Sequence, residues 1–325
     1  MLQKLKSSWS ILKQTFVHFD DNAVPRMSAA LSYYTLFSLA PILLIVITVS
    51  SIFYGREAIE GSLFGQIQQF VGTDAAKQIQ EIIRNAAAAK NTHFASVISV
   101  VALVFSATGV FSEIQSSINT IWQLKAKPRK SWLYFLLNRI LSLSMVLGLG
   151  FILLVSLVVN AALELLLNRL LTVLPEGSVW LTYGLNMLIT FIVISFLFGV
   201  IFKLLPDAKI HWKDVRQGAF VTTVLFMLGK FGISYYLGKS NPGGTYGTAG
   251  SVVIILLWVY FSAMILYFGA CFTKVNAQHR GRQIFPNKYA VFVQQIEVEN
   301  KAPLQAQHEK KVVEKKEAPG EKNKG

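Results

Sequence analysis

The feature that most constrains this chain is a series of six long stretches with almost no charged residues. A membrane-spanning helix needs about 20 consecutive apolar residues, and buried helices of soluble proteins rarely stay uncharged for that length. The sequence therefore predicts an all-α polytopic membrane protein with six transmembrane helices. The predicted spans lie at about 28–54, 94–117, 140–163, 178–202, 217–238 and 250–273.

The composition agrees with a membrane protein that carries an excess of basic residues. Hydrophobic residues make up 53% of the chain and charged residues only 15%, against roughly 25% charged in an ordinary soluble domain. The formal charge of +14 would suit a nucleic-acid binder, but such proteins are seldom this apolar. A single cysteine, Cys271, excludes an intramolecular disulfide and any cysteine-based zinc site.

The segments between the predicted spans are alternately rich and poor in positive charge, so most of the positive charge falls on one predicted side of the membrane. Of the 31 Lys and Arg residues, 24 lie in the N-terminal segment, in the loops after the second and fourth spans, and in the C-terminal segment. Cytoplasmic loops collect Lys and Arg, so both termini are predicted to be cytoplasmic. We expect no nucleic-acid partner, because this charge reports membrane topology.

Three regions follow from these patterns. Residues 1–26 are predicted to form an amphipathic helix, which either lies on the cytoplasmic leaflet or packs on the membrane domain. Residues 27–285 would form the membrane domain, and the external loop at 55–93 has the spacing of amphipathic helices. Residues 286–325 would form a cytoplasmic tail, disordered from about residue 301 because it is Lys/Glu-rich and nearly free of apolar residues.

Motifs for enzymatic chemistry are largely absent. The five histidines are far apart and form no HExxH pair, and no GxSxG elbow occurs. The run ending in Gly238-Lys239-Ser240 resembles the end of a Walker A loop, but Ile233 stands where that loop needs glycine. We therefore expect no catalytic residues, no bound metal and no cofactor, and we do not expect an enzyme.

One charge inside a predicted span stands out as a candidate for function. Lys230 lies in the fifth span, and a lysine at the bilayer centre costs roughly 2.5 kcal/mol or more, so it marks a functional site by default. Thr223 and Ser234 lie on the same helical face and predict a polar stripe turned inward. The alternative is that Lys230 extends toward the outer headgroups, which its stem reaches only in part.

Other polar residues complete a candidate transport pathway. The first span carries a stripe of hydroxyl residues that ends near a proline, where a kink or a freed carbonyl is expected. Such stripes also serve close helix packing, and that alternative stays open. Glu113 could pair with Arg26 or Lys230, and the glycine-rich outer segment is either a tight turn or a short re-entrant element. The further pathway residues are Ser28, Ser32, Thr35, Ser38, Pro41, Glu113, Asn119, Tyr246 and Gly247.

Several of these segments together resemble one bacterial family. The runs at 28–41, 109–122 and 204–219, and a fourth block of motifs between 228 and 273, resemble the YihY/BrkB family of inner-membrane proteins. The resemblance implies a six-helix bacterial inner-membrane protein. The family pattern usually has a glutamate where this chain has Cys271. Relatives have carried a ribonuclease label, which no acidic metal triad or histidine cluster in this sequence supports.

The patterns and the resemblance together lead to two hypotheses for function. The first is a transporter that moves a lipid or an anionic envelope-related solute, with the bilayer and that substrate as its partners. The second is a non-transporting scaffold, or envelope-integrity factor, that binds envelope proteins through its outer helices and basic cytoplasmic face. The sequence leaves the substrate, the coupling ion and the oligomeric state open.

Overall fold

A computed structural model describes ten parts of the chain, and they are predominantly helical. The described residues are 2–50, 60–61, 64–65, 67–68, 73–88, 108–126, 178–240, 250–282, 284–287 and 290–293. The helices are α1 (Leu2–Asp21), α2 (Val24–Ser50), α4 (Thr73–Ala88), α7 (Ser178–Leu204), α8 (Trp212–Ser240) and α10 (Gly250–His279), together with helical residues 108–121, here called the 108–121 helix. The strands are β1 (Leu124–Ala126), β2 (Ala208–Lys209), β3 (Phe285–Pro286) and β4 (Ala290–Phe292).

Three described helices are long and apolar enough to cross a membrane. They are Val24–Ile47 within α2, Met187–Leu204 within α7 and Val252–His279 within α10. These coincide with the first, fourth and sixth predicted spans. The fifth predicted span is helical in α8, but α8 does not reach the same apolarity. The span predicted at 94–117 is described only from residue 108, and the span predicted at 140–163 lies outside the described residues.

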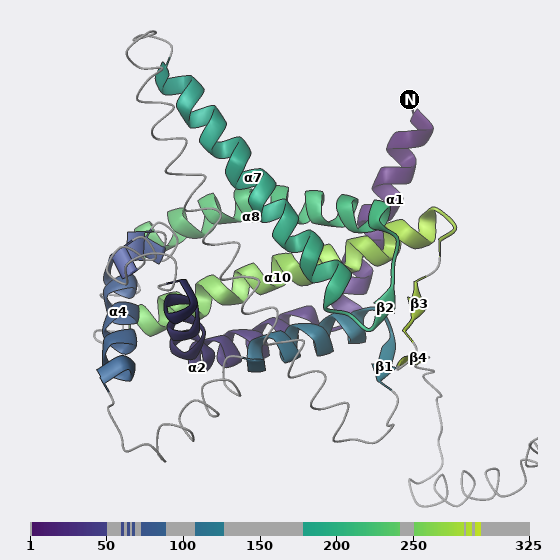
Figure 1. Cartoon of the computed structure of the whole chain (residues 1–325). Helices are drawn as coiled ribbons and strands as arrows, with labels where there is room; N and C mark the ends of the chain where they lie inside the picture. The colour runs from purple at the N-terminus through teal and green to yellow at the C-terminus, as the bar shows by residue number, and fades with distance from the viewer. Residues whose placement is uncertain are drawn as a thin grey trace, which may run out of the picture. The chain divides into compact units, whose positions relative to one another are not determined.

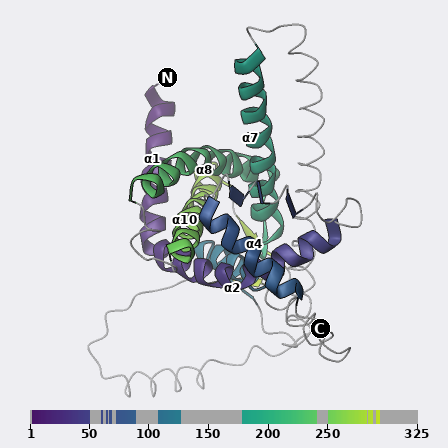
Figure 2. The same cartoon turned by 90° about the vertical axis from the view of Figure 1, so that its left-hand side faces the viewer.

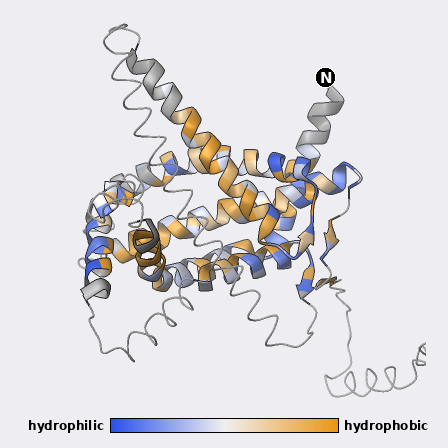
Figure 3. Ribbon diagram, in the orientation of Figure 1, coloured by the Kyte–Doolittle hydropathy of each residue, from blue (hydrophilic) through white to orange (hydrophobic). Residues whose placement is uncertain are grey.

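The helix α10 is the centre of the packing. It contacts α2 and α8 along their lengths, α8 packs on α7, and α1 packs against α10. Figure 1 shows α2, α8 and α10 running in the same general direction, while α1 stands steeply to them at the end where the strands lie. Figure 2 shows α1 standing upright beside α8 and α10. The most apolar residues are concentrated in α7, α10 and the later part of α2 (Figure 3).

Two short antiparallel pairs of strands join the predicted cytoplasmic segments. The pair β1–β4 sets Leu124 opposite Phe292, and the pair β2–β3 sets Ala208 opposite Pro286. The loops after the second and fourth predicted spans and the segment after the sixth therefore meet at one end of the helices. Hydropathy does not predict strands this short. The strands also continue past residue 286, the predicted start of the tail.

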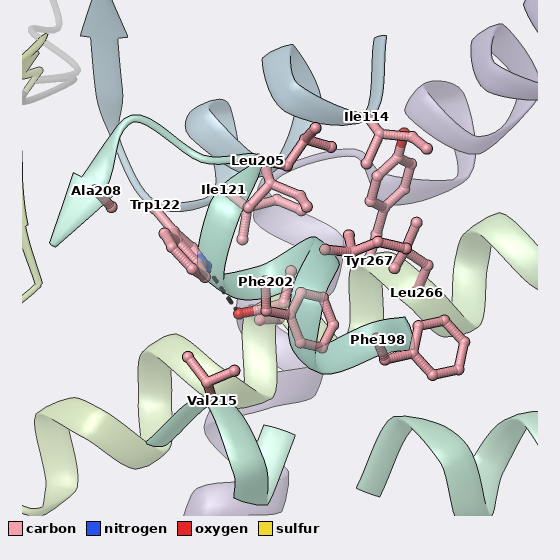
Figure 4. Packing of buried hydrophobic residues seen from close by; sticks show 14 of the residues in the cluster. Ile114, Ile121, Trp122, Phe198, Phe202, Leu205, Ala208, Val215, Leu266 and Tyr267 are labelled. Carbon is pink, nitrogen blue, oxygen red and sulfur yellow. Dashed lines mark hydrogen bonds between the residues drawn. The ribbon is translucent and has the colours of Figure 1, made fainter. Parts of the chain in front are cut away.

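The main core lies close to this end. Trp122, Phe202 and Tyr267 are almost fully buried there, and they come from three different parts of the chain. The indole Nε1 of Trp122 donates to the carbonyl oxygen of Ala270 at 3.0 Å (Figure 4). Burying an aromatic ring and satisfying its N–H is the arrangement that stabilises a core tryptophan.

A second apolar cluster lies at the opposite ends of α2 and α10. Ile79 and Ile83 of α4 pack there with Val46, Ile47 and Ile255. The spacing of Ile79 and Ile83 predicts an amphipathic helix in the external loop, and α4 confirms that helix. Its packing closes the predicted outer ends of α2 and α10.

The N-terminal helix α1 is packed on one side and open on the other. Thr15 is fully buried, and the rings of Phe16 and Phe19 lie 5.1 and 6.0 Å from the ring of Phe268 in α10. Trp9 remains 70% exposed, and Leu12 is exposed as well. The structure thus packs α1 on the membrane domain and leaves it an apolar face on which a leaflet could lie.

Candidate functional site

Lys230 lies on α8 where the packed face of that helix meets its exposed face. One turn earlier, Phe226 packs between α7 and α10, with its ring 5.7 Å from Phe198 and 6.3 Å from Trp258. Residues four apart share a helical face, so Lys230 continues the line of Phe226. Its neighbours Leu228 and Phe231 are more than half exposed. The Lys230 side chain itself is half-buried.

The polar stripe predicted beside Lys230 is only partly described. Thr223 is fully buried, and its Oγ1 donates to the carbonyl oxygen of Ala219 at 2.8 Å. The side chain of Ser234 lies outside the described residues, as do Tyr246 and Gly247. The inward stripe around Lys230 therefore stays a prediction.

The hydroxyl stripe of the first span lies on α2 and is mostly buried. Ser32 and Thr35 each donate to a carbonyl oxygen of their own helix at 2.8 Å. Ser38 packs against the 108–121 helix, where a Cβ on Gly109 would lie 3.7 Å from the Ser38 hydroxyl. Ser28 is fully buried, and its hydroxyl has no hydrogen-bond partner among the described residues. These contacts are those of close helix packing.

Two further predictions concern the backbone of α2 and the carboxylate of Glu113. Helix α2 continues through Pro41 to Ser50, so the proline does not end the helix. A kink or a freed carbonyl at Pro41 stays a prediction. Glu113 accepts a hydrogen bond from Ser117 at 3.4 Å. The hydroxyl of Tyr267 is buried and has no hydrogen-bond partner among the described residues. Ion pairing of Glu113 with Arg26 or Lys230 stays a prediction.

Asn119 has a structural partner that the sequence does not indicate. Its Nδ2 donates to Asp207 Oδ2, and its Oδ1 accepts from the Asp207 backbone N–H, both at 2.9 Å. Asp207 precedes β2, so this double hydrogen bond ties the loop between α7 and α8 to the 108–121 helix. In the described structure, Asn119 therefore links the 108–121 helix to the loop between α7 and α8.

At the same end, a buried lysine links α10 to the 108–121 helix. Lys274 of α10 is only 4% exposed, and its Nζ donates to the carbonyl oxygen of Ile121 at 2.8 Å. Ile121 is the last residue of the 108–121 helix, and Gln123 just beyond it has a positive φ of 58°. A lysine on the final carbonyls of a helix satisfies acceptors that the helix leaves unpaired. Charge counting along the sequence places Lys274 in the basic tail segment and misses this contact.

The helices α8 and α10 approach each other closely through two reciprocal pairs of glycine and threonine. A Cβ on Gly218 of α8 would lie 1.9 Å from Thr273 Oγ1 of α10, and a Cβ on Gly269 of α10 would lie 1.9 Å from Thr222 Oγ1 of α8. Each threonine donates to the glycine carbonyl four residues earlier in its own helix, at 2.7 Å. Small residues four apart bring membrane helices together. The Gly-x-x-x-Thr spacing in both segments is the signal that could have found this contact.

The construction of these helices defines the class of protein. Long apolar helices that pack through glycine, serine and threonine are the construction of an α-helical membrane protein. Within the described parts of the chain, no cluster of three His, Cys, Asp or Glu residues could hold a metal ion. The protein is accordingly an integral membrane protein.

Comparison with known proteins gives the family. Residues 15–289 match the family described as "Virulence factor BrkB", and the chain belongs to that family. The resemblance read from the sequence motifs is thereby confirmed.

Three relatives show how the family is described. A UPF0761 membrane protein of Mannheimia succiniciproducens is 24% identical over 276 residues, which cover 82% of this chain and 88% of the relative. A UPF0761 membrane protein of Pseudoalteromonas atlantica is 26% identical, covering 82% and 86%. A Bacillus subtilis relative named "Putative ribonuclease-like protein YfkH" is 23% identical, covering 86% and 98%. No solved structure matches the chain significantly.

Proposed function

We propose that this protein is a transporter that moves a lipid or an anionic envelope-related solute across the bacterial inner membrane. The observation that carries the proposal is the position of Lys230. It is a basic residue within a predicted span, half-buried, one turn from a side chain that packs between α7 and α10. A cation held at that depth is expensive and is retained where it serves a substrate or ion pathway.

The composition of α8 supports the same proposal. The helix α8 is less apolar on average than α2, α7 and α10, the other long described helices that coincide with predicted spans. Lys230 and the threonines contribute to this polarity, and α8 packs against both α7 and α10. A long helix that is less apolar than its neighbours suits the wall of a pathway better than a purely lipid-facing position.

The proposal is tested by reconstituting the full chain in liposomes and measuring flux of labelled phospholipids and anionic solutes. We expect Lys230→Met to abolish most of the flux and Lys230→Arg to retain part of it, because the arginine keeps the charge. Lys77→Met removes an exposed lysine of α4 and should leave flux unchanged. Equal flux in all variants would remove Lys230 from the mechanism, and no flux of any lipid or solute would overturn the transport proposal.

A second candidate function is a scaffold that binds envelope proteins, and α4 is the observation that favours it. While Ile79 and Ile83 are buried, Lys77, Glu81 and Arg84 of α4 remain exposed on its other face. A charged helix face at the predicted outer side suits protein contacts. Crosslinking should then return a stoichiometric partner, and replacement of residues 56–93 should abolish the crosslink.

We also propose an orientation of the protein in the membrane and a class of function that it does not have. Both termini are proposed to be cytoplasmic, following the distribution of Lys and Arg, and the protein is proposed not to be an enzyme or a nucleic-acid binder. Reporter fusions at residues 1 and 325 test the orientation. Metal-dependent cleavage of RNA by the purified protein would contradict the proposed class.

A further inference from the structure

A cavity lies where α1, α8 and α10 meet, at the end of the helices that carries the strands. Its volume is about 480 Å³, and none of the residues placed in the transport pathway lines it. The apolar span within α10 ends at His279, next to the Asn276 and Arg280 that line the cavity. The sixth predicted span ends at about residue 273, so the cavity lies close to the predicted cytoplasmic end of that span, where we place the lipid headgroups.

The polar lining of the cavity consists of two arginines and two amides. Arg216 and Arg280 are exposed, and neither forms an ion pair with another described residue. The guanidinium group stays charged at all physiological pH values and fits phosphate oxygens in a forked geometry. No acidic side chain lines the cavity in the described structure. The nearby Asp214 is buried and already paired with Arg282 at 3.3 Å.

The two amides strengthen the preference for an anion. Asn276 Nδ2 donates to Gln217 Oε1 at 2.7 Å. That bond occupies one lone pair of the Gln217 oxygen and leaves the N–H pair of Gln217 available to donate to a ligand. Two guanidinium groups and an amide donor together favour a ligand made of acceptor oxygens.

The rest of the lining is apolar, which argues for a lipid rather than a free ion. Ile11 of α1, Phe220 and Val221 of α8 and Phe272 of α10 complete the wall. Phe220 is itself 54% exposed. Acyl chains leaving the cavity would meet such a surface, whereas a free phosphate gains nothing from it.

From these contacts we propose that the cavity binds the phosphate headgroup of an anionic phospholipid. Basic pockets between membrane helices on the cytoplasmic side recognise headgroups of this kind. The proposal concerns binding and holds whether or not the protein transports its ligand.

The experiment is native mass spectrometry of the full chain in detergent, with phosphatidylglycerol, phosphatidylcholine or inorganic phosphate added. We expect phosphatidylglycerol to bind in preference to phosphatidylcholine, with inorganic phosphate competing poorly. The double substitution Arg216→Gln with Arg280→Gln should weaken phosphatidylglycerol binding at least about tenfold, the scale set by a lost charge-assisted hydrogen bond. The control is Lys209→Gln with Lys213→Gln, two exposed lysines at the same end that do not line the cavity.

A second pair of variants tests the space inside the cavity while keeping its positive charge. Ile11→Trp should fill the space with both arginines intact and should also weaken binding. Leu12→Trp places the same ring on a neighbouring residue that does not line the cavity and should bind as the parent does. The proposal is overturned if the lysine pair matters as much as the arginine pair, if both lipids bind equally, or if inorganic phosphate displaces the lipid at equal concentration.

Discussion

The close contact between α8 and α10 predicts that Gly269→Ala destabilises the protein. Gly269→Ala would place a methyl group 1.9 Å from Thr222 Oγ1, 3.0 Å from its Cβ and 3.1 Å from the ring of Phe202. An ordinary contact needs about 3.4 Å, so the two helices must separate by about 1.5 Å. Otherwise Thr222 must change rotamer and lose its 2.7 Å hydrogen bond to Gly218. Overpacking of this kind costs about 1–3 kcal/mol.

The assay is unfolding of the purified protein in mixed micelles of increasing denaturing detergent. Gly232→Ala is the matched control, because nothing lies within 4 Å of its Cβ position. It should leave the free energy of unfolding unchanged or raise it by up to about 1 kcal/mol through helix propensity. Thr222→Ala in the Gly269→Ala background should recover part of the loss, since the clashing oxygen is gone. If Gly269→Ala is as stable as Gly232→Ala, the α8–α10 contact is not as close as described.

Two further predictions concern the strand-bearing end. Asp207→Ala removes the carboxylate that Asn119 binds at 2.9 Å, and it should lower the free energy of unfolding by about 1.5–3 kcal/mol, measured by the same detergent titration. The pKa of His18 lies below its ordinary value of 6.5 because of burial and the nearby Lys274, with Asp21 opposing. The unfolded chain therefore binds the proton more readily, and the stability that neutral His18 contributes above pH 6.5 is lost as the pH falls. Thermal unfolding between pH 7.5 and 5.5 should show a smaller loss for His18→Gln than for the parent.

The helices of the described structure were predictable because their signal is local. Uninterrupted apolar residues predict α2, α7 and α10, and the spacing of Ile79 and Ile83 predicts α4. Each of these patterns needs only the sequence of one segment, together with the length of a membrane span or the period of a helix.

The contacts that hold the end of the bundle were not predictable, because each joins residues far apart in the chain. Asn119 was assigned to a transport pathway by its polarity, whereas its partner Asp207 lies 88 residues away. Lys274 was counted as a topological charge, although it binds the end of a helix 153 residues earlier. Short strands such as β1 and β4 carry no hydropathy signal that distinguishes them from loop.

If the protein is a transporter, Lys230 lies on a pathway open to water and solutes. The most direct test replaces the buried Cys271 with alanine and adds Lys230→Cys or Leu228→Cys, which lies on the same helix and is 63% exposed. A charged, membrane-impermeant thiol reagent should modify the Lys230→Cys variant far faster than the Leu228→Cys variant, because only the former would face water. Equal or slower modification of the Lys230→Cys variant would show that Lys230 does not face a water-filled pathway.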